Sequence, residues 1–366
     1  MNIAILGLSI TSSWGNGHAT TFRSLVKGLH RRGHKVIFLE RDMPWYASNR
    51  DMPVSEFCKI ILYNSTAELR KEHSDTVRNA DAVMVGSYVP DGIEIGRWVT
   101  ENAKGIKAFY DIDTPVTLSK LRIGSCQYIS PLLIPHYDIY LSFTAGPCLG
   151  IFEREYGSPA ARKFYCSVDP DLYYPSKSSK KWDMGYLGTY SDDRQPALNS
   201  LMLEAAMKWP EGKFVVAGPQ YPAAISWPSN VERIEHMPPS RHVDFYNNQR
   251  YTLNITRQDM VKMGYSPSVR LFEAAACGAP LVSDWWEGLD TLFRPGEEIF
   301  ISQSADDTLQ VLTGVSESQR SRVGENSRKV VLEYHTGYQR AAEFEEYVSE
   351  AAVIRRTKSR VPAGQG

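Results

Sequence analysis

The sequence has little excess charge of either sign and no long apolar run. Its 41 Lys and Arg residues against 42 Asp and Glu residues give a formal net charge of −1 at pH 7. A protein with this balance has no overall positive field to attract polyanions, so we expect no nucleic-acid partner. No stretch approaches the roughly 18 consecutive apolar residues of a membrane helix, so we also expect no transmembrane segment.

Cysteine is scarce, and its spacing forms no recognisable pair. The five cysteines are scattered without a CxxC motif, and an odd number suits neither a disulfide framework nor a zinc site. The chain runs directly into an apolar stretch at residues 3–8, without the basic leader of a secretory signal. We therefore expect reduced thiols and a cytoplasmic protein.

What the sequence does contain is a globular composition and two series of short apolar runs. Its 366 residues are 42% apolar and 23% charged, which suggests about two ordinary folded domains. Such runs, separated by helical periodicity, are typical of parallel strands that are buried on both faces. The expected strands span residues 3–8, 35–40, 82–85, 108–110 and 139–142 in the first series, and 184–188, 214–217, 231–234, 252–256 and 281–283 in the second.

These two series predict two doubly wound α/β domains, which are expected to face each other across a cleft. The boundary is expected in a stretch rich in Pro, Ser and Lys at 168–181, because helix breakers and solvated charge favour a linker. We predict a first domain over 1–170, a second over 171–332, a terminal helix over 333–354 and a frayed tail over 355–366.

The most informative segment holds a predicted helix with clear signals at both ends. Ser266 is a suitable N-cap, Pro267 suits the first helical position, and Gly278 followed by Pro280 predicts the end of the helix. The free N–H groups and the positive dipole end of such a helix favour an anion. At a strand-to-helix junction beside a cleft, this anion is expected to be a diphosphate.

Arg270 and Glu273 lie three residues apart, so they project from one face of this predicted helix. A guanidinium one turn into the helix can reach phosphate oxygens, and a carboxylate one turn deeper can accept both hydroxyls of a ribose. The alternative is an ordinary i,i+3 salt bridge on a solvated face. The spacing alone leaves both interpretations open.

The run SPSVRLFEAAACGAPLVSDWWEGLD at 266–290, with LFRPGEE at 292–298, resembles the C-terminal domain of GT-B glycosyltransferases of the CgeB-like (spore maturation protein B-like) family. The likeness extends through WGNGH at 14–18, DIDTP at 111–115 and LNITR at 253–257. It implies two Rossmann-like domains. A nucleoside-diphosphate sugar, UDP-sugar foremost, is expected on the C-terminal domain and an acceptor on the N-terminal one, with the terminal helix crossing back to the N-terminal domain.

The resemblance also assigns donor-side residues. Glu273 aligns with the second acid of the E-x7-E signature, which usually holds the ribose, whereas the first acid is replaced by Tyr265, so retention or inversion stays open. Trp285 and Trp286 are candidates for an aromatic wall against the sugar or base, or for ordinary core packing. The remaining donor candidates lie in loops and turns that can meet the nucleotide: Gly188, Thr189, Arg194, His236, Arg257, Ser266 and Ser268. For Arg194 and Arg257 the alternative is a surface role in a turn or ion pair.

The loop after the first strand is the candidate acceptor region. Trp14, Asn16 and Gly17 are expected to contact the acceptor, and His18 is the first candidate base because histidine titrates near neutrality and nothing apolar need bury it. Its alternative role is to orient the loop. The spacing G-x-G-x-x-G is absent although Gly7 and Glu40 are present, so no NAD cofactor is expected.

Asp111 and Asp113 follow another expected strand, at the edge where ligands bind in such sheets. Asp113 is the second candidate base, and Asp111 a candidate acceptor contact. The letters D-I-D match a metal signature of a different glycosyltransferase fold, but in the half of the chain that is wrong for a donor diphosphate. We therefore predict a metal-independent reaction with no cofactor, in which helix dipole and cationic groups stabilise the leaving nucleotide.

Together these features predict a glycosyltransferase of the hexosyltransferase type, which moves a sugar from a nucleoside-diphosphate sugar to an acceptor hydroxyl or similar nucleophile. Two alternatives stay open. One is a GT-B sugar-nucleotide epimerase, and the other is a non-catalytic nucleotide- or sugar-binding assembly protein.

Overall fold

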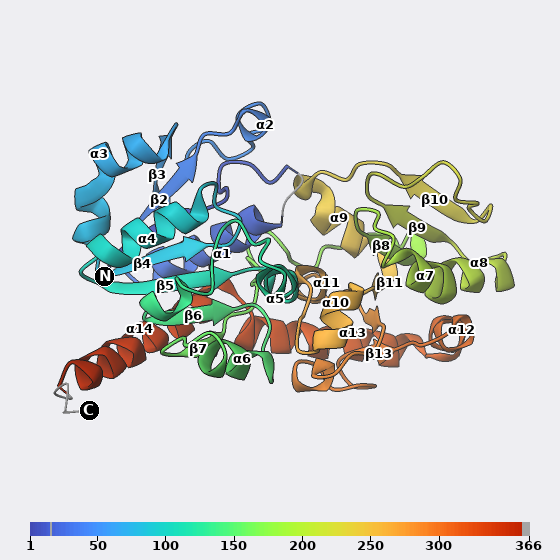
Figure 1. The fold of residues 1–366 in the computed structure, drawn as a ribbon. Helices are drawn as coiled ribbons and strands as arrows, with labels where there is room; N and C mark the ends of the chain where they lie inside the picture. The colour runs from blue at the N-terminus through green and yellow to red at the C-terminus, as the bar shows by residue number, and fades with distance from the viewer. Residues whose placement is uncertain (15–16, 361–366) are drawn as a thin grey trace. The chain divides into compact units, whose positions relative to one another are not determined.

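The computed structural model describes residues 1–14 and 17–360 (Figure 1). The chain divides into two compact units, one made of Met1–Ser167 with the C-terminal segment from Gly337, and one made of Val168–Thr336. Each unit contains one parallel sheet whose strands alternate with helices along the chain. In the described part of the chain, no helix is both long enough and apolar enough to cross a membrane.

The first unit contains a seven-stranded sheet in the order β3-β2-β1-β4-β5-β6-β7. Its strands are β1 (Asn2–Gly7), β2 (Lys35–Arg41), β3 (Lys59–Tyr63), β4 (Ala82–Gly86), β5 (Ile106–Asp111), β6 (Ile139–Ser142) and β7 (Ala161–Lys163). Its helices are α1 (His18–Arg31), α2 (Pro44–Ala47), α3 (Thr66–Arg78), α4 (Gly92–Asn102), α5 (Thr114–Arg122), η1 (Ile134–His136), α6 (Cys148–Arg154) and α14 (Gly337–Arg360).

The second unit contains a six-stranded sheet in the order β10-β9-β8-β11-β12-β13. Its strands are β8 (Trp182–Leu187), β9 (Phe214–Ala217), β10 (Val231–Ile234), β11 (Gln249–Asn254), β12 (Leu281–Ser283) and β13 (Phe300–Ile301). Its helical segments are α7 (Gln195–Leu198), η2 (Asn199–Leu203), α8 (Glu204–Lys208), η3 (Pro239–Arg241), α9 (His242–Asn247), α10 (Gln258–Met263), α11 (Val269–Ala276), η4 (Leu289–Thr291), α12 (Ala305–Gly314) and α13 (Glu317–Tyr334).

All ten expected strands are present, and the three that were not expected, β3, β7 and β13, lie at edges of the two sheets. Strand β3 is mostly half-buried, and β7 and β13 have only three and two residues. An edge strand has one neighbour and less burial, so its sequence does not need the continuous apolar run that marks a central strand. Strand β1, with five of six residues buried, shows that run clearly.

Helix α14 packs against α1 within the first unit. The two helices touch at glycines, since a Cβ added to Gly28 would lie 1.9 Å from the Gly337 carbonyl oxygen. One turn further, Arg32 donates two hydrogen bonds of 2.7 Å to the Glu345 carboxylate. Close glycine packing and a bidentate ion pair therefore hold the last helix to the first.

Glu40, at the end of β2, organises the loop that follows β1. Its carboxylate accepts hydrogen bonds from the backbone N–H groups of Ile10 (2.6 Å) and Thr11 (3.0 Å), and from the hydroxyls of Thr11 (2.6 Å) and Ser9 (3.1 Å). Gly7 has a packing role, because a Cβ there would lie 2.3 Å from the Phe38 ring. In this protein both residues that a dinucleotide site would use therefore have structural roles: the glycine allows close packing and the acid holds the loop.

Candidate functional site

Helix α11 begins two residues later than the sequence predicts. Its first residue is Val269 and its N-cap is Ser268, so the prediction of Ser266 as N-cap is wrong. The Ser266 hydroxyl instead donates to the Gly264 carbonyl oxygen, two residues earlier, at 2.8 Å. The predicted end is confirmed, since Gly278 follows the helix with a φ of 68°.

Arg270 lies in the first turn of α11 and is only 8% exposed. Its Nε donates to the Leu187 carbonyl oxygen at 2.6 Å and its Nη1 to Asn254 Oδ1 at 3.0 Å, while the guanidinium lies 4.8 Å from the centre of the Tyr186 ring. Among the described residues no ion pair joins Arg270 to Glu273. The alternative of a solvated i,i+3 salt bridge is therefore wrong.

Gly188, directly after β8, faces this guanidinium. A Cβ added to Gly188 would lie 2.6 Å from the Tyr186 hydroxyl and 3.1 Å from Arg270 Nη2. The Tyr186 hydroxyl is buried and has no hydrogen-bond partner within the described chain. A phenol and a guanidinium thus border a backbone turn that lacks a side chain, an arrangement suited to phosphate oxygens. We call Gly188, Tyr186 and Arg270 the anion cradle.

Glu273 lies one turn further along α11 and is 5% exposed. The Tyr246 hydroxyl donates to its Oε2 at 3.0 Å, and His242 Nδ1 lies 3.9 Å from the same oxygen. A carboxylate so far from solvent needs such partners, because an unpaired buried charge is costly. Arg270 and Glu273 are therefore both buried, separately partnered charges on one short helix.

Two residues that the sequence analysis did not select complete this region. Asn254, at the end of β11, accepts the Ser268 hydroxyl at 2.7 Å and the Arg270 guanidinium through the same Oδ1. Asp284, after β12, accepts the backbone N–H of Thr256 at 3.0 Å, and burial raises the pKa of Asp284. Asp284 follows a predicted strand, so the rule that polar strand ends form sites would have selected it, whereas Asn254 lies within the predicted strand 252–256 and is a strand end only in the structure.

The other donor candidates lie in loops of the second unit. Arg194 Nη2 donates to the Thr189 carbonyl oxygen at 2.7 Å, which closes the turn after β8. Arg257 Nε lies 3.6 Å from Asp193 Oδ2, so this cation is paired. His236 is exposed after β10. Local contacts therefore account for Arg194 and Arg257 without a ligand.

The two tryptophans after β12 differ sharply in exposure. Trp285 is 41% exposed, whereas Trp286 is 1% exposed and its indole nitrogen has no hydrogen-bond partner in the described part of the chain. A sugar can stack only on an accessible ring face. In this structure Trp285 offers such a face and Trp286 belongs to the core.

In the first unit, the acceptor-side candidates gather at the carboxyl ends of β1, β4 and β5, which are neighbours in the sheet. His18 is the first residue of α1, and its ring meets the Tyr88 ring edge-on with centroids 5.4 Å apart. Burial lowers the pKa of His18 to about 4, and its buried Nδ1 has no hydrogen-bond partner among the described residues. His18 therefore differs from the expected neutral-pH titrating group, because the fold buries it.

Tyr88 connects His18 to the second candidate base. Its hydroxyl donates to Asp113 Oδ2 at 2.8 Å, and Lys120 Nζ lies 4.9 Å from the centre of its ring. Its φ of 63° is unusual for a residue that is not glycine, and such strain occurs often at functional sites. Tyr88 thus joins two candidate site residues, and the sequence analysis did not select it although it follows a predicted strand.

Asp111 lies buried beneath the loop that carries Asp113 and holds this loop through hydrogen bonds. It is fully buried and accepts the Tyr140 hydroxyl at 2.6 Å, the Thr117 hydroxyl at 2.8 Å and the backbone N–H of Asp113 at 3.1 Å. Burial raises the pKa of Asp111 to about 6, against these hydrogen bonds. Its side chain thus fixes the loop that carries Asp113 and has no surface to offer an acceptor.

The loop before α1 carries the other acceptor candidates. Trp14 is 53% exposed, and Gly17 is the exposed N-cap of α1. Asn16 lies outside the described residues. No group of three or more His, Cys, Asp or Glu side chains within the described ranges is placed to hold a metal ion.

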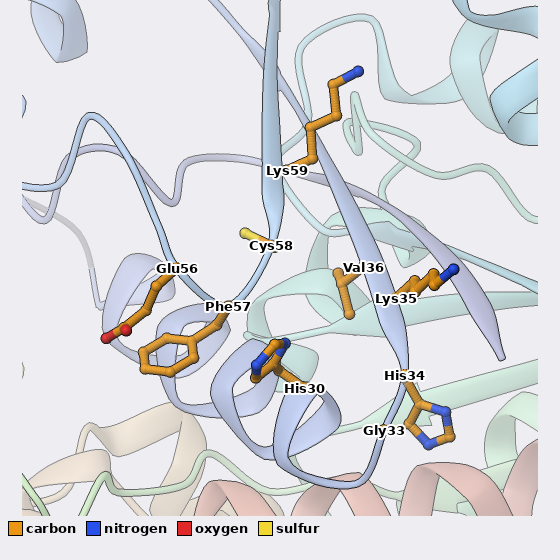
Figure 2. A pocket seen from close by; sticks show the side chains of 9 residues that line it. All are labelled: His30, Gly33, His34, Lys35, Val36, Glu56, Phe57, Cys58 and Lys59. Atoms are coloured by element: carbon orange, nitrogen blue, oxygen red, sulfur yellow. The ribbon is translucent and has the colours of Figure 1, made fainter.

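A hollow elsewhere in the first unit lies where β2 and β3 begin, and Figure 2 shows its lining. His30 faces Phe57 at a ring distance of 5.6 Å, whereas the amino groups of Lys35 and Lys59 point away from His30. These lysines do not converge on one point. The hollow lies at the amino ends of its strands and includes none of the predicted site residues.

Comparison with known proteins agrees with this architecture. Residues 194–346 match a family described as glycosyl transferase-like, and no curated protein matches the sequence. Three similar solved structures are sucrose-phosphate synthase from Thermosynechococcus elongatus (13% identity, 97% of this chain and 98% of that one, TM-score 0.65), Anabaena HepE with UDP and glucose (12%, 96% and 100%, 0.69) and an alpha-glucosyltransferase with UDP-glucose and DNA (13%, 95% and 99%, 0.72).

The chain has the GT-B fold. The agreement covers nearly the whole chain at identities too low to carry function, so it shows the architecture of two Rossmann-like domains. It confirms the predicted fold class. Within that GT-B fold, the anion cradle and Glu273 occupy the second unit, and the His18, Tyr88 and Asp113 cluster occupies the first.

One expectation needs correction. The alpha-glucosyltransferase that shares the GT-B fold is seen in complex with DNA containing an abasic site, and in others with DNA containing an HMU base. A net charge near zero was the reason to exclude nucleic acid, and that global quantity says nothing about a local binding surface. The prediction of no nucleic-acid partner is therefore wrong.

Proposed function

We propose that the protein is a metal-independent, CgeB-like glycosyltransferase that moves a sugar from a UDP-sugar to an acceptor hydroxyl. The observation that carries this proposal is the anion cradle, in which a buried guanidinium and an unpartnered phenol face a glycine turn beside the start of α11. The glycosyl transferase-like family match, over residues 194–346, includes Arg270 and α11, whereas Tyr186 and Gly188 precede it. Solved structures with the same fold contain UDP or UDP-glucose, which favours uridine as the base.

On the donor side, Arg270 and the amino end of α11 hold the diphosphate, and Glu273 accepts ribose hydroxyls. The segment at His236 contacts the base, and Trp285 stacks on the sugar. As the bond between the anomeric carbon and the diphosphate oxygen breaks, negative charge develops on that oxygen. Fixed donors at the cradle stabilise this charge without needing to reorganise, which is the main source of the rate enhancement.

On the acceptor side, the first unit supplies the base. The acceptor oxygen forms a bond to the anomeric carbon and loses its proton to Asp113 or to His18. We favour Asp113, because the Tyr88 hydroxyl holds its carboxylate in place at 2.8 Å, whereas the buried Nδ1 of His18 has no hydrogen-bond partner among the described residues to orient it. His18 then orients the acceptor, and Trp14 provides an exposed ring for it to pack on.

A ligand screen followed by turnover tests this function. Melting temperature is measured with UDP, dTDP, GDP, ADP, their sugar conjugates and NAD, because a ligand that binds the native state raises it. We expect UDP and one UDP-sugar to stabilise the protein, and slow release of UDP from that UDP-sugar when water replaces the acceptor. The proposal is contradicted if only NAD raises the melting temperature, or if none of the nucleotides does. Binding without UDP release, when candidate acceptors are also supplied, indicates a non-catalytic binding protein.

A further inference from the structure

Glu273 is held from one side by side chains of a neighbouring helix. Tyr246 and His242 lie on α9, four residues apart and therefore on one face. Tyr246 is fully buried and its hydroxyl donates to Glu273 Oε2 at 3.0 Å, while His242 Nδ1 lies 3.9 Å from that oxygen. Burial and the Glu273 carboxylate both raise the pKa of Tyr246 well above its ordinary value, so this phenol keeps the proton that it donates.

A second tyrosine closes the group. Tyr173, in the segment that precedes β8, places its hydroxyl 3.5 Å from His242 Nδ1, and its ring centroid lies 6.4 Å from that of Tyr246. Burial first and the neighbouring Glu273 second raise the pKa of Tyr173 well above its ordinary value. Two phenols and an imidazole therefore converge on one carboxylate. We call Tyr173, His242 and Tyr246 the carboxylate clamp.

The clamp also reaches the segment that follows β10. The other ring nitrogen of His242, Nε2, lies 3.2 Å from the carbonyl oxygen of Met237. Met237 is the neighbour of His236, which we place against the nucleobase. His242 thus lies between the ribose carboxylate and the base-contacting segment, so a displacement of its ring changes both.

We propose that Tyr246 and His242 are positioning residues for the donor nucleoside: they fix the direction of the Glu273 carboxylate and its spacing from the Met237 segment without touching the donor. This inference rests on the proposed function, since it requires that Glu273 binds ribose. A group that must accept hydroxyls in one direction gains from a preformed orientation, because binding then costs less side-chain ordering. Donor affinity should therefore depend on side chains that lie behind the carboxylate.

The decisive variant is Tyr246→Phe, which keeps the ring and removes only the hydroxyl. We expect the Kd for UDP, measured by calorimetry on the full chain, to rise about tenfold, the effect of one lost hydrogen bond to a charged group. Turnover at saturating donor should stay within about twofold of wild type, because the reacting atoms are untouched. A raised KM with an unchanged kcat is what a positioning role predicts.

A matched control separates positioning from general loosening of the unit. Tyr251 is also fully buried, and its hydroxyl donates to the Val311 carbonyl oxygen at 3.2 Å, on strand β11 against α12. Tyr251→Phe removes an equivalent buried hydrogen bond away from Glu273. We expect it to lower the melting temperature while the Kd for UDP stays at the wild-type value.

His242 provides a second, independent test, because its side chain is partly exposed and its replacement endangers folding less. His242→Leu should weaken UDP binding, and His242→Gln, whose amide can still reach either partner, should restore part of the loss. If Tyr246→Phe does not fold, these two variants decide.

The outcomes distinguish the inference from the function on which it rests. If wild-type protein does not bind UDP or any other nucleoside diphosphate, the proposed function fails and this inference fails with it. If wild-type protein binds UDP, and Tyr246→Phe and His242→Leu bind it within about twofold of wild type, only the inference is overturned. Equal losses in Tyr246→Phe and Tyr251→Phe also overturn it.

Discussion

The two units build their candidate sites in contrasting ways. In the second unit the charged site residues are buried and hydrogen-bonded, with Arg270 8% and Glu273 5% exposed, and the Tyr186 hydroxyl beside Arg270 has no partner within the described chain. In the first unit the strained Tyr88 packs against His18, whose Nδ1 is buried, and Trp14 in the loop before α1 is 53% exposed. Under the proposed function, this contrast means that the donor side is preformed for a chemically constant ligand, whereas the acceptor side leaves its specificity to loops.

We therefore expect that a single added methyl group in the second unit can abolish most of its donor binding. We expect Gly188→Ala to weaken UDP binding by at least about 100-fold, because its methyl group meets two rigidly packed groups, the Tyr186 hydroxyl and the Arg270 guanidinium. Calorimetry with UDP measures the loss. Gly314→Ala is the control, because a Cβ there meets nothing closer than 3.9 Å. A Gly188→Ala protein with wild-type affinity contradicts the cradle.

For the acceptor-side residues we expect the opposite pattern, in which kcat falls while the affinity for the donor nucleotide is unchanged. Asp113→Asn should lower kcat about 100-fold, since it removes the proton acceptor while keeping the shape of the side chain. The Kd for UDP should not change, because donor and base belong to different units. His18→Gln in the same assay decides between the two bases: a larger loss of kcat there than in Asp113→Asn shows that His18 takes the proton.

A smaller effect is expected at Tyr88, which positions the base. Tyr88→Phe removes the hydrogen bond to Asp113 and should lower kcat about tenfold at unchanged UDP affinity. Tyr137→Phe is matched to it, because the Tyr137 hydroxyl is buried in the same unit with no partner among the described residues. A kcat equal in the two variants removes Tyr88 from the account.

The smallest effect concerns stability and separates Asp111 from the exposed acceptor residues. The native pKa of Asp111, raised to about 6, exceeds the ordinary value near 3.8, so its contribution to stability is present at low pH and is lost as the pH rises through 6. The loss approaches about 3 kcal/mol. The side chain in the Asp111→Asn variant cannot ionise, so this variant does not undergo that loss of stability. The melting temperature of the variant relative to wild type should therefore rise from pH 5 to pH 7.5, and a constant difference contradicts the raised pKa.

Much of the fold and part of the site follow from the sequence. The nine strands inside the two sheets and the edge strand β10 could be predicted, whereas the edge strands β3, β7 and β13 were missed. Arg270 and Glu273 could be predicted because a single helix sets their spacing. The acceptor cluster could not be assembled in the same way, because Tyr88 and His18 come from separate strand ends and their contact depends on sheet order.

The hydrogen-bond and packing partners of the predicted residues are the hardest feature to predict from the sequence. Nothing in the residues around Glu273 along the chain indicates that Tyr246 donates to it, since the bond depends on how α9 packs against α11. Likewise, His18 packs against Tyr88 from the segment after β4, and its burial lowers its pKa, which a local pattern in the sequence does not reveal. Sequence spacing therefore identifies charges more readily than the surroundings that tune them.

The central claim is that Arg270 holds the donor diphosphate. Calorimetric titration of UDP into wild type, Arg270→Gln and Arg250→Gln tests it most directly. Arg250 is the control cation, because it belongs to the same unit and pairs with Asp183 and Glu317 away from the cradle. The account predicts that wild type and Arg250→Gln bind UDP with equal Kd and that Arg270→Gln shows no measurable binding. Equal binding by all three proteins, with each folded, would contradict the assignment of the diphosphate to Arg270.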